Sequence, residues 1–140
     1  MNKLGARTKS GGLQLAYHNH DKEFVPEGQG HFPYDLLLQH TDASLMTMQI
    51  DLFWGDKDWL SPVPFLKRHP GRVASFHIKE RGNTDEGGML CSGASFIGLN
   101  VTPKARVASG VRHFAIENED DRDHYACAAK TISYLKSLSF

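Results

Sequence analysis

The sequence repeats one pattern four times: a short apolar run, a polar residue at its end, a loop marked by glycine or proline, and a segment with helix signals. The apolar runs cover residues 13–17, 45–50, 72–76 and 111–116. Strands that alternate with helices pair in parallel through right-handed crossovers. The runs also lack strict alternation of polar and apolar residues, which is typical of strands covered on both faces. The repeat therefore predicts an α/β fold with a parallel sheet.

Helix signals separate the predicted strands. Pro33 stands at the first position of a helix over YDLLLQH. The Ser-Pro pair at 61–62 and the Thr-Pro pair at 102–103 each supply an N-cap followed by proline. Gly71 and Gly110 occupy the position just after a helix, where a left-handed backbone is needed. These signals predict one helix between successive strands.

Two later segments differ in character. Residues 123–138 place apolar side chains, Tyr125 and Ile132 among them, at helical spacing, and they predict a helix with one apolar stripe. Residues 82–100 are rich in glycine and serine, and we interpret them either as an active-site loop or as a surface excursion.

Composition and charge are those of a single globular domain over residues 1–140. The 16 basic and 16 acidic residues give a net charge of zero, so the chain offers no basic surface to a nucleic acid. No apolar segment approaches the length of a membrane span, and the N-terminus lacks the apolar core of a signal peptide. We therefore expect a cytoplasmic protein, with Cys91 and Cys127 as free thiols and a disulfide left open.

Each predicted strand delivers a polar residue near its carboxyl end, where parallel α/β sheets bind ligands. The four residues are Glu23, Asp51, His77 and Glu117. Three carboxylates and one imidazole suit Mn²⁺, Mg²⁺, Co²⁺ or Zn²⁺, with positions left open for a substrate. Purely structural interpretations exist as well: a turn cap for Asp51, a core histidine for His77 and a solvated charge for Glu117. Other residues near Glu23 compete for its role, namely His18, His20 and Asp21.

Four stretches carry a resemblance to a known family: GLQLAYHNHDKEF, YDLLLQHTDASLMTMQIDLFW, FLKRHPGRVASFHIKE and GVRHFAIENED. In this order they resemble the sugar phosphate isomerase/epimerase family, the xylose isomerase-like TIM barrels. The match runs from about residue 4 to the C-terminus and weakens across 85–102. The resemblance implies a (β/α)₈ barrel with one divalent metal ion. Because only its last four units match, the chain is expected to form half of such a barrel, with four strands and four helices.

The resemblance also implies roles for individual residues. Its metal ligands fall on Glu23, Asp51, His77 and Glu117, and the two glutamates would also serve as catalytic base and acid. The substrate-binding residues that it implies are His18 or His20, Lys79 and Arg81. Trp54 stands where some branches of the family have a histidine, and we expect it to stack on a sugar face. The implied reaction is proton abstraction next to the carbonyl of a sugar or sugar phosphate, which begins an isomerisation, an epimerisation or the elimination of a lyase or dehydratase.

The half-length match leaves a second function open, a non-catalytic carbohydrate-binding or oligomeric scaffold derived from the same family. A nuclease of the related endonuclease barrels is disfavoured, because a neutral chain does not attract phosphates.

Four strands do not close a barrel, so the first and last strands should be open edges that invite pairing. We expect the barrel-lining face to be apolar, with Leu13, Leu15, Met48, Ile50, Phe76 and Phe114 on it. A second copy related by a two-fold axis would cover this face and give a homodimer. The alternative is that residues 82–100 fold over the open face of a monomer.

Overall fold

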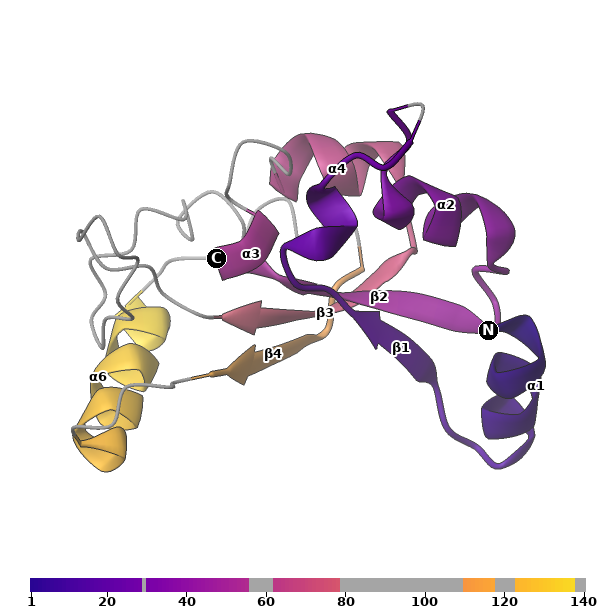
Figure 1. Ribbon diagram of the computed structural model, residues 1–140. Coiled ribbons are helices and arrows are strands. Elements are labelled where there is room, and N and C mark those ends of the chain that lie inside the picture. The colour runs from indigo at the N-terminus through magenta and orange to yellow at the C-terminus, as the bar shows by residue number, and fades with distance from the viewer. Residues whose placement is uncertain (29, 56–61, 79–109, 118–122, 138–140) are drawn as a thin grey trace.

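The computed structural model describes residues 1–28, 30–55, 62–78, 110–117 and 123–137 (Figure 1). The elements in chain order are α1 (Asn2–Ser10), β1 (Leu15–His18), the 3-10 turn η1 (Lys22–Phe24), α2 (Pro33–His40), β2 (Met46–Asp51), α3 (Leu52–Gly55), α4 (Pro62–Arg68), β3 (Val73–Ile78), β4 (His113–Ile116) and α6 (His124–Ser137). The predictions for Lys79, Arg81, residues 82–100 and the helix after Thr102 lie outside the described residues.

The four strands form one parallel sheet in the order β1-β2-β3-β4. The predicted α/β class and all four strands are confirmed, and no strand end differs from the predicted one by more than two residues. Two local signals for helix ends are confirmed: Pro33 opens α2, and Gly71, which follows α4, has a φ of +75°. Gly110 has a φ of +82°, but the helix predicted before it lies outside the described residues. No helix in the described part of the chain is long and apolar enough to cross a membrane.

The helices α2 and α4 cover one face of the sheet (Figure 1). The buried apolar residues of the strands form one cluster with residues of these helices. Met48, Ile50 and Phe76 are completely buried and belong to one cluster with Tyr34 of α2 and Phe65 of α4. Our prediction that these three strand residues line the barrel interior is therefore wrong. Successive side chains of a strand alternate between its two faces, so the residues between them occupy the other face.

The face opposite the helices is polar. Cross-strand register places Gln49 beside Ser75, and Ser75 beside His113, while Asp51 lies beside His77 one step further along the strands. A bulge between Met48 and Gln49 shifts the register of β2 against β3. The side of the sheet that should line a barrel thus carries hydrogen-bonding and titratable side chains rather than an apolar surface.

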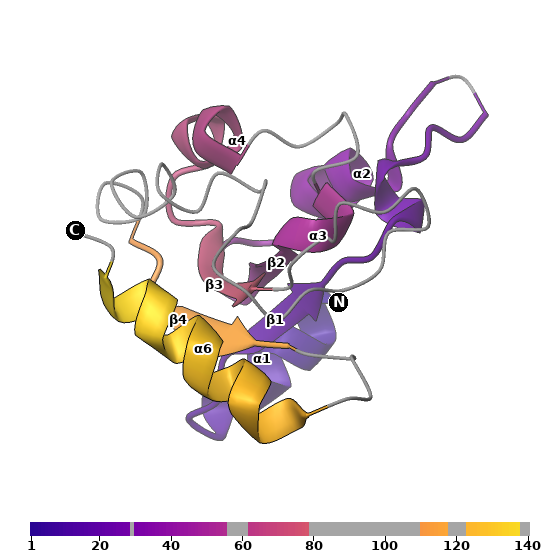
Figure 2. The same cartoon turned by 90° about the vertical axis from the view of Figure 1, so that its left-hand side faces the viewer.

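The final helix also departs from prediction. Figures 1 and 2 show α6 beyond the carboxyl end of the sheet, not in the layer of α2 and α4. Tyr125 and Ile132, expected in its buried stripe, are 92% and 43% exposed, whereas Cys127 and Thr131 are buried. Cys127 is disulfide-bonded, so a free thiol at this position was the wrong expectation.

A buried arginine joins α2 to the start of β3. Arg72, 8% exposed, donates from its guanidinium to the carbonyl of Thr41 at 2.7 Å and to the hydroxyl of Thr41 at 2.7 Å. Thr41 is the C-cap of α2, where carbonyl groups lack helical partners and the helix dipole favours a cation. The arginine therefore fixes the position of α2 against the sheet.

Candidate metal centre

The carboxyl ends of the four parallel strands bring together four titratable side chains. His18 and Asp51 are the last residues of β1 and β2, His77 is the next-to-last residue of β3, and Glu117 follows β4. One ligand atom from each of the four lies within 4.8 Å of the others. The structure thus assembles three of the four predicted metal ligands, Asp51, His77 and Glu117, with His18 as the fourth member. We call this group the carboxyl-edge cluster.

Short contacts hold the carboxyl-edge cluster together. His77 Nδ1 lies 2.7 Å from Glu117 Oε2, and His18 Nε2 lies 3.8 Å from Asp51 Oδ2. The rings of His18 and His77 are 4.4 Å apart between centroids. The Asp51 side chain is completely buried, whereas those of His18, His77 and Glu117 are 25%, 24% and 28% exposed. The cluster therefore has a buried base and a side that solvent can reach.

Backbone groups orient the Asp51 carboxylate. Its Oδ1 accepts hydrogen bonds from the N–H groups of Phe53 at 2.8 Å and Trp54 at 3.2 Å, which is the N-cap arrangement for the short helix α3. The Asp51 N–H in turn donates to Oδ1 of Asn19, a completely buried residue, at 3.1 Å. The cap fixes one carboxylate oxygen, and the other, Oδ2, lies on the side of His18.

The protonation state of His18 suits a metal ligand. Burial, with a further contribution from the neighbouring His77, lowers the pKa of His18 below its ordinary value, which favours the neutral imidazole that can coordinate a metal. Its Nδ1 is buried, and within the described residues it has no hydrogen-bond partner. Two imidazoles and two carboxylates are a donor set that divalent ions such as Mn²⁺, Co²⁺ and Zn²⁺ accept.

Glu23 lies in η1 and is not a member of the carboxyl-edge cluster. Its Oε1 accepts a hydrogen bond from the Tyr17 hydroxyl at 2.5 Å, and its Oε2 accepts one from the His20 N–H at 2.9 Å. Burial alone would raise the pKa of Glu23, but these hydrogen bonds outweigh it and leave the pKa below its ordinary value. Burial and the carboxylate together raise the pKa of Tyr17 to about 12, so the phenol stays a donor.

Two further predicted site residues, His20 and Trp54, lie beside the carboxyl-edge cluster. His20 packs against His18 with ring centroids 5.0 Å apart, and Trp54 lies 6.0 Å from His20. The two rings thus extend the cluster on one side. Sequence reasoning missed Tyr17 and Asn19, which hold Glu23 and Asp51. The signal for Asn19 was its place between two histidines in YHNHD, directly after a strand.

Comparison of the structure with solved proteins identifies similar folds. A sugar phosphate isomerase/epimerase from Parabacteroides distasonis matches 97% of this chain and 51% of its own, with a TM-score of 0.79 and 23% identity. A second sugar phosphate isomerase/epimerase from the same organism matches with a TM-score of 0.76 and 28% identity, over 97% of this chain and 50% of that protein. A xylose isomerase domain protein from Planctomyces limnophilus gives a TM-score of 0.68 at 14% identity, over 96% of this chain and 49% of its own.

No protein-family model and no curated protein matches the sequence. The chain spans about half the length of the solved structures that it matches. These neighbours are TIM-barrel isomerases, and the chain is similar to them over nearly all of its own residues. The fold of this chain is therefore similar to about one half of the TIM barrel of these proteins.

Proposed function

We propose that the chain is a divalent-metal-dependent sugar or sugar phosphate isomerase/epimerase-like protein, acting by proton abstraction next to a carbonyl. The observation that carries the proposal is the carboxyl-edge cluster. It lies where parallel α/β folds bind ligands, in a chain similar to sugar phosphate isomerase/epimerase and xylose isomerase-like proteins.

The residues that would hold the ion are His18, Asp51, His77 and Glu117. A bound divalent cation would polarise the carbonyl and hydroxyl oxygens of a sugar and so acidify the neighbouring C–H group. The buried Asp51 fits this role, because a carboxylate without solvent access needs a cation or several donors nearby. Two imidazoles make the set richer in nitrogen than predicted, which favours Mn²⁺, Co²⁺ or Zn²⁺ over Mg²⁺.

In this proposal Glu23 is the proton acceptor. Its lowered pKa keeps the carboxylate ionised at neutral pH, and the Tyr17 hydroxyl and His20 N–H fix both oxygens. A fixed carboxylate loses little orientational freedom when a substrate arrives. Glu117, 28% exposed and 2.7 Å from His77, is the second carboxylate able to exchange a proton at the site. His20 and Trp54 would contact the sugar beside the cluster.

Metal binding and proton transfer are tested in separate assays. Mn²⁺ should raise the melting temperature of the protein, because an ion that binds only the folded state stabilises it. His77→Ala should abolish that rise, whereas His113→Ala, which removes an imidazole on the same face but outside the cluster, should leave it unchanged. Equal responses of His77→Ala and the parent would contradict the metal site.

Proton transfer is followed by deuterium uptake from heavy water into D-fructose or D-xylulose in the presence of Mn²⁺, observed by NMR. Glu23→Gln should lose the uptake but keep the Mn²⁺ response, because Glu23 is outside the cluster. A parent protein that binds Mn²⁺ and exchanges no proton would favour the non-catalytic carbohydrate-binding or scaffold alternative.

We also propose that the chain forms a two-fold homodimer. Within the described sheet, β1 pairs only with β2 and β4 only with β3, so each outer strand has one open edge. A two-fold axis along the barrel axis would place β4 of one copy parallel to β1 of its partner at both seams. The matched proteins are about twice as long as this chain, which agrees with an eight-stranded assembly. The polar faces would then line the interior of the barrel, with the two clusters at its carboxyl-end mouth.

A further inference from the structure

A second candidate site lies on the helix-covered side of the sheet, away from the carboxyl-edge cluster. It is a cleft of about 240 Å³ lined by residues of η1, α2 and α4. Its floor consists of three core aromatic residues, Phe24, Tyr34 and Phe65, which are 6%, 2% and 3% exposed. The volume is below the roughly 300–1,000 Å³ of pockets for drug-sized ligands, so it fits a ligand of about one ring.

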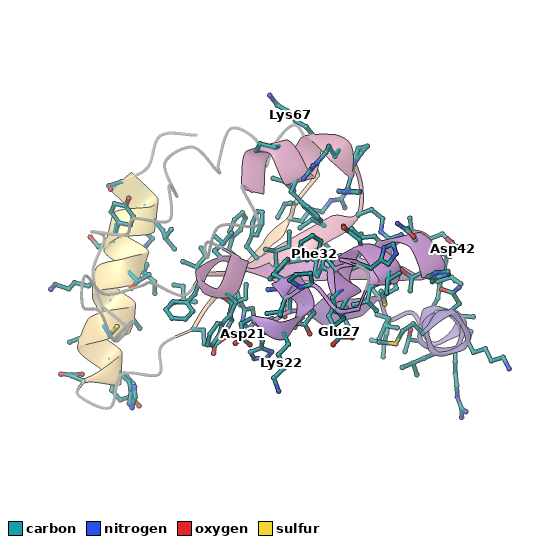
Figure 3. All side chains as sticks on the ribbon, turned by 45° about the horizontal axis from the view of Figure 1, so that its top comes forward. Asp21, Lys22, Glu27, Phe32, Asp42 and Lys67 are labelled. Carbon is teal, nitrogen blue, oxygen red and sulfur yellow. The ribbon has the colours of Figure 1, made fainter. Side chains whose placement is uncertain are left out.

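The aromatic floor is continuous. The rings of Phe24 and Tyr34 are 5.0 Å apart between centroids, and those of Tyr34 and Phe65 are 5.6 Å apart. Phe32, the N-cap residue of α2 labelled in Figure 3, adds a fourth ring. Ring faces and edges of this kind pack well against the C–H groups of a small cyclic ligand.

Three polar side chains complete the lining: Asp35, Arg68 and His69. Neither Asp35 nor Arg68 takes part in an ion pair within the described part of the chain, so both remain available to a ligand. Burial and the nearby Arg68 lower the pKa of His69, which leaves this ring neutral at pH 7. The cleft therefore presents one cation, one anion and one neutral imidazole.

The Tyr34 hydroxyl lies beneath the aromatic floor. Tyr34 lines the cleft, its side chain is almost fully buried, and its hydroxyl has no hydrogen-bond partner among the described residues. A buried hydroxyl without a partner costs free energy. The oxygen itself has no accessible surface, so a ligand in the cleft would meet the ring of Tyr34 rather than its hydroxyl.

We propose that this cleft binds a neutral monosaccharide in its ring form. An ionised ligand would be attracted by one of Asp35 and Arg68 and repelled by the other, whereas sugar hydroxyls can donate to the carboxylate and accept from the guanidinium at the same time. The apolar face of the sugar ring would pack on the aromatic floor. The site is separate from the proposed metal centre, since its floor residues belong to the core under the helices.

The test is saturation-transfer NMR of the whole chain with D-glucose, D-xylose, D-glucuronate and D-glucosamine as probes. The neutral sugars should bind in the millimolar range, and the two charged sugars should bind more weakly. Phe32→Ala and Arg68→Gln should each weaken neutral-sugar binding by about tenfold, the effect of one lost good contact. Maltose that binds with the same dependence would identify the end of a glycan as the source of the sugar.

Controls separate this cleft from the metal centre. Lys67→Gln removes a neighbouring cation of α4 that does not line the cleft, and it should leave binding unchanged. With EDTA present, so that no sugar binds through a metal ion, His77→Ala should also leave it unchanged, and failure of the metal centre then does not affect this result. Tyr34→Phe keeps the ring and removes only a hydroxyl that a ligand in the cleft does not reach, so it should leave binding unchanged as well. Equal binding to Arg68→Gln and Lys67→Gln, or no binding of either neutral sugar, would overturn the proposal.

Discussion

Asp51 has two tasks that two substitutions can separate. Its Oδ1 caps α3 through the N–H groups of Phe53 and Trp54, at 2.8 and 3.2 Å, and its Oδ2 lies 3.8 Å from His18 Nε2 in the carboxyl-edge cluster. Asp51→Asn keeps an oxygen at the cap but removes the negative charge. Asp51→Ala removes both. The first task concerns folding without metal, and the second concerns metal binding.

The two tasks predict different free energies. Without metal, Asp51→Asn should change the free energy of unfolding by less than about 1 kcal/mol, because asparagine and aspartate cap helices equally well. Asp51→Ala should lower it by about 1–2 kcal/mol through loss of the cap. With Mn²⁺ at about 100 times its dissociation constant, the parent should gain about 2.7 kcal/mol. Both variants should lose most of this gain, since an amide oxygen is a weaker ligand than a carboxylate.

Urea unfolding of the three proteins, with EDTA and with Mn²⁺, measures all of these quantities. The slope of the transition must stay constant between variants, so that a shift of its midpoint reports stability alone. If Mn²⁺ stabilises Asp51→Asn as much as the parent, Asp51 is not a ligand. If Asp51→Asn without metal is as unstable as Asp51→Ala, the carboxylate does not stabilise the metal-free protein by capping α3.

Two further predictions concern packing and assembly. Helix propensity alone would favour Gly5→Ala in α1 by about 1 kcal/mol, but the new Cβ would lie 2.4 Å from the Leu45 carbonyl oxygen. We therefore expect a loss of about 1–3 kcal/mol from overpacking, whereas Gly11→Ala, whose nearest contact would be 3.4 Å, should unfold near the parent temperature. Light scattering at micromolar concentration should give a particle of twice the 15.6 kDa chain mass; a monodisperse particle at the single-chain mass would exclude the homodimer.

The parts of the fold that the sequence predicts are those with local causes. Pro33 fixes the start of α2 because its ring presets a helical φ, and Gly71 marks a helix end because its φ is positive. The faces of the strands have a local cause as well, and here our interpretation was wrong. In MTMQID the period of two already places Asp51 on the face of Gln49, opposite Met48. The bulge between β2 and β3, in contrast, has no signal in either strand alone.

The site residues that stand at the ends of strands could be predicted from the sequence, and the others could not. Asp51, His77 and Glu117 were found because they follow apolar runs, and parallel strands bring their carboxyl ends together. His18 belongs to the cluster as well, because β1 extends one residue beyond the predicted strand and ends at His18. The placement of Glu23 depends on η1 and on a hydrogen bond from Tyr17 six residues earlier. The Arg72–Thr41 contact joins residues 31 apart, and no local pattern encodes it.

The sheet has an apolar face under the helices and a polar face that carries the cluster, and this division relates assembly of the protein to its proposed reaction. The helix-covered face carries the apolar core, so substitutions in the carboxyl-edge cluster should leave most of that burial intact. The polar face carries His18, His77 and Glu117 at 24% to 28% exposure, which leaves water in contact with the cluster. Proton abstraction next to a carbonyl is easier where water is excluded and charges act in a lower dielectric. A partner sheet over the polar face would supply that exclusion, so we infer that assembly and catalysis depend on the same surface.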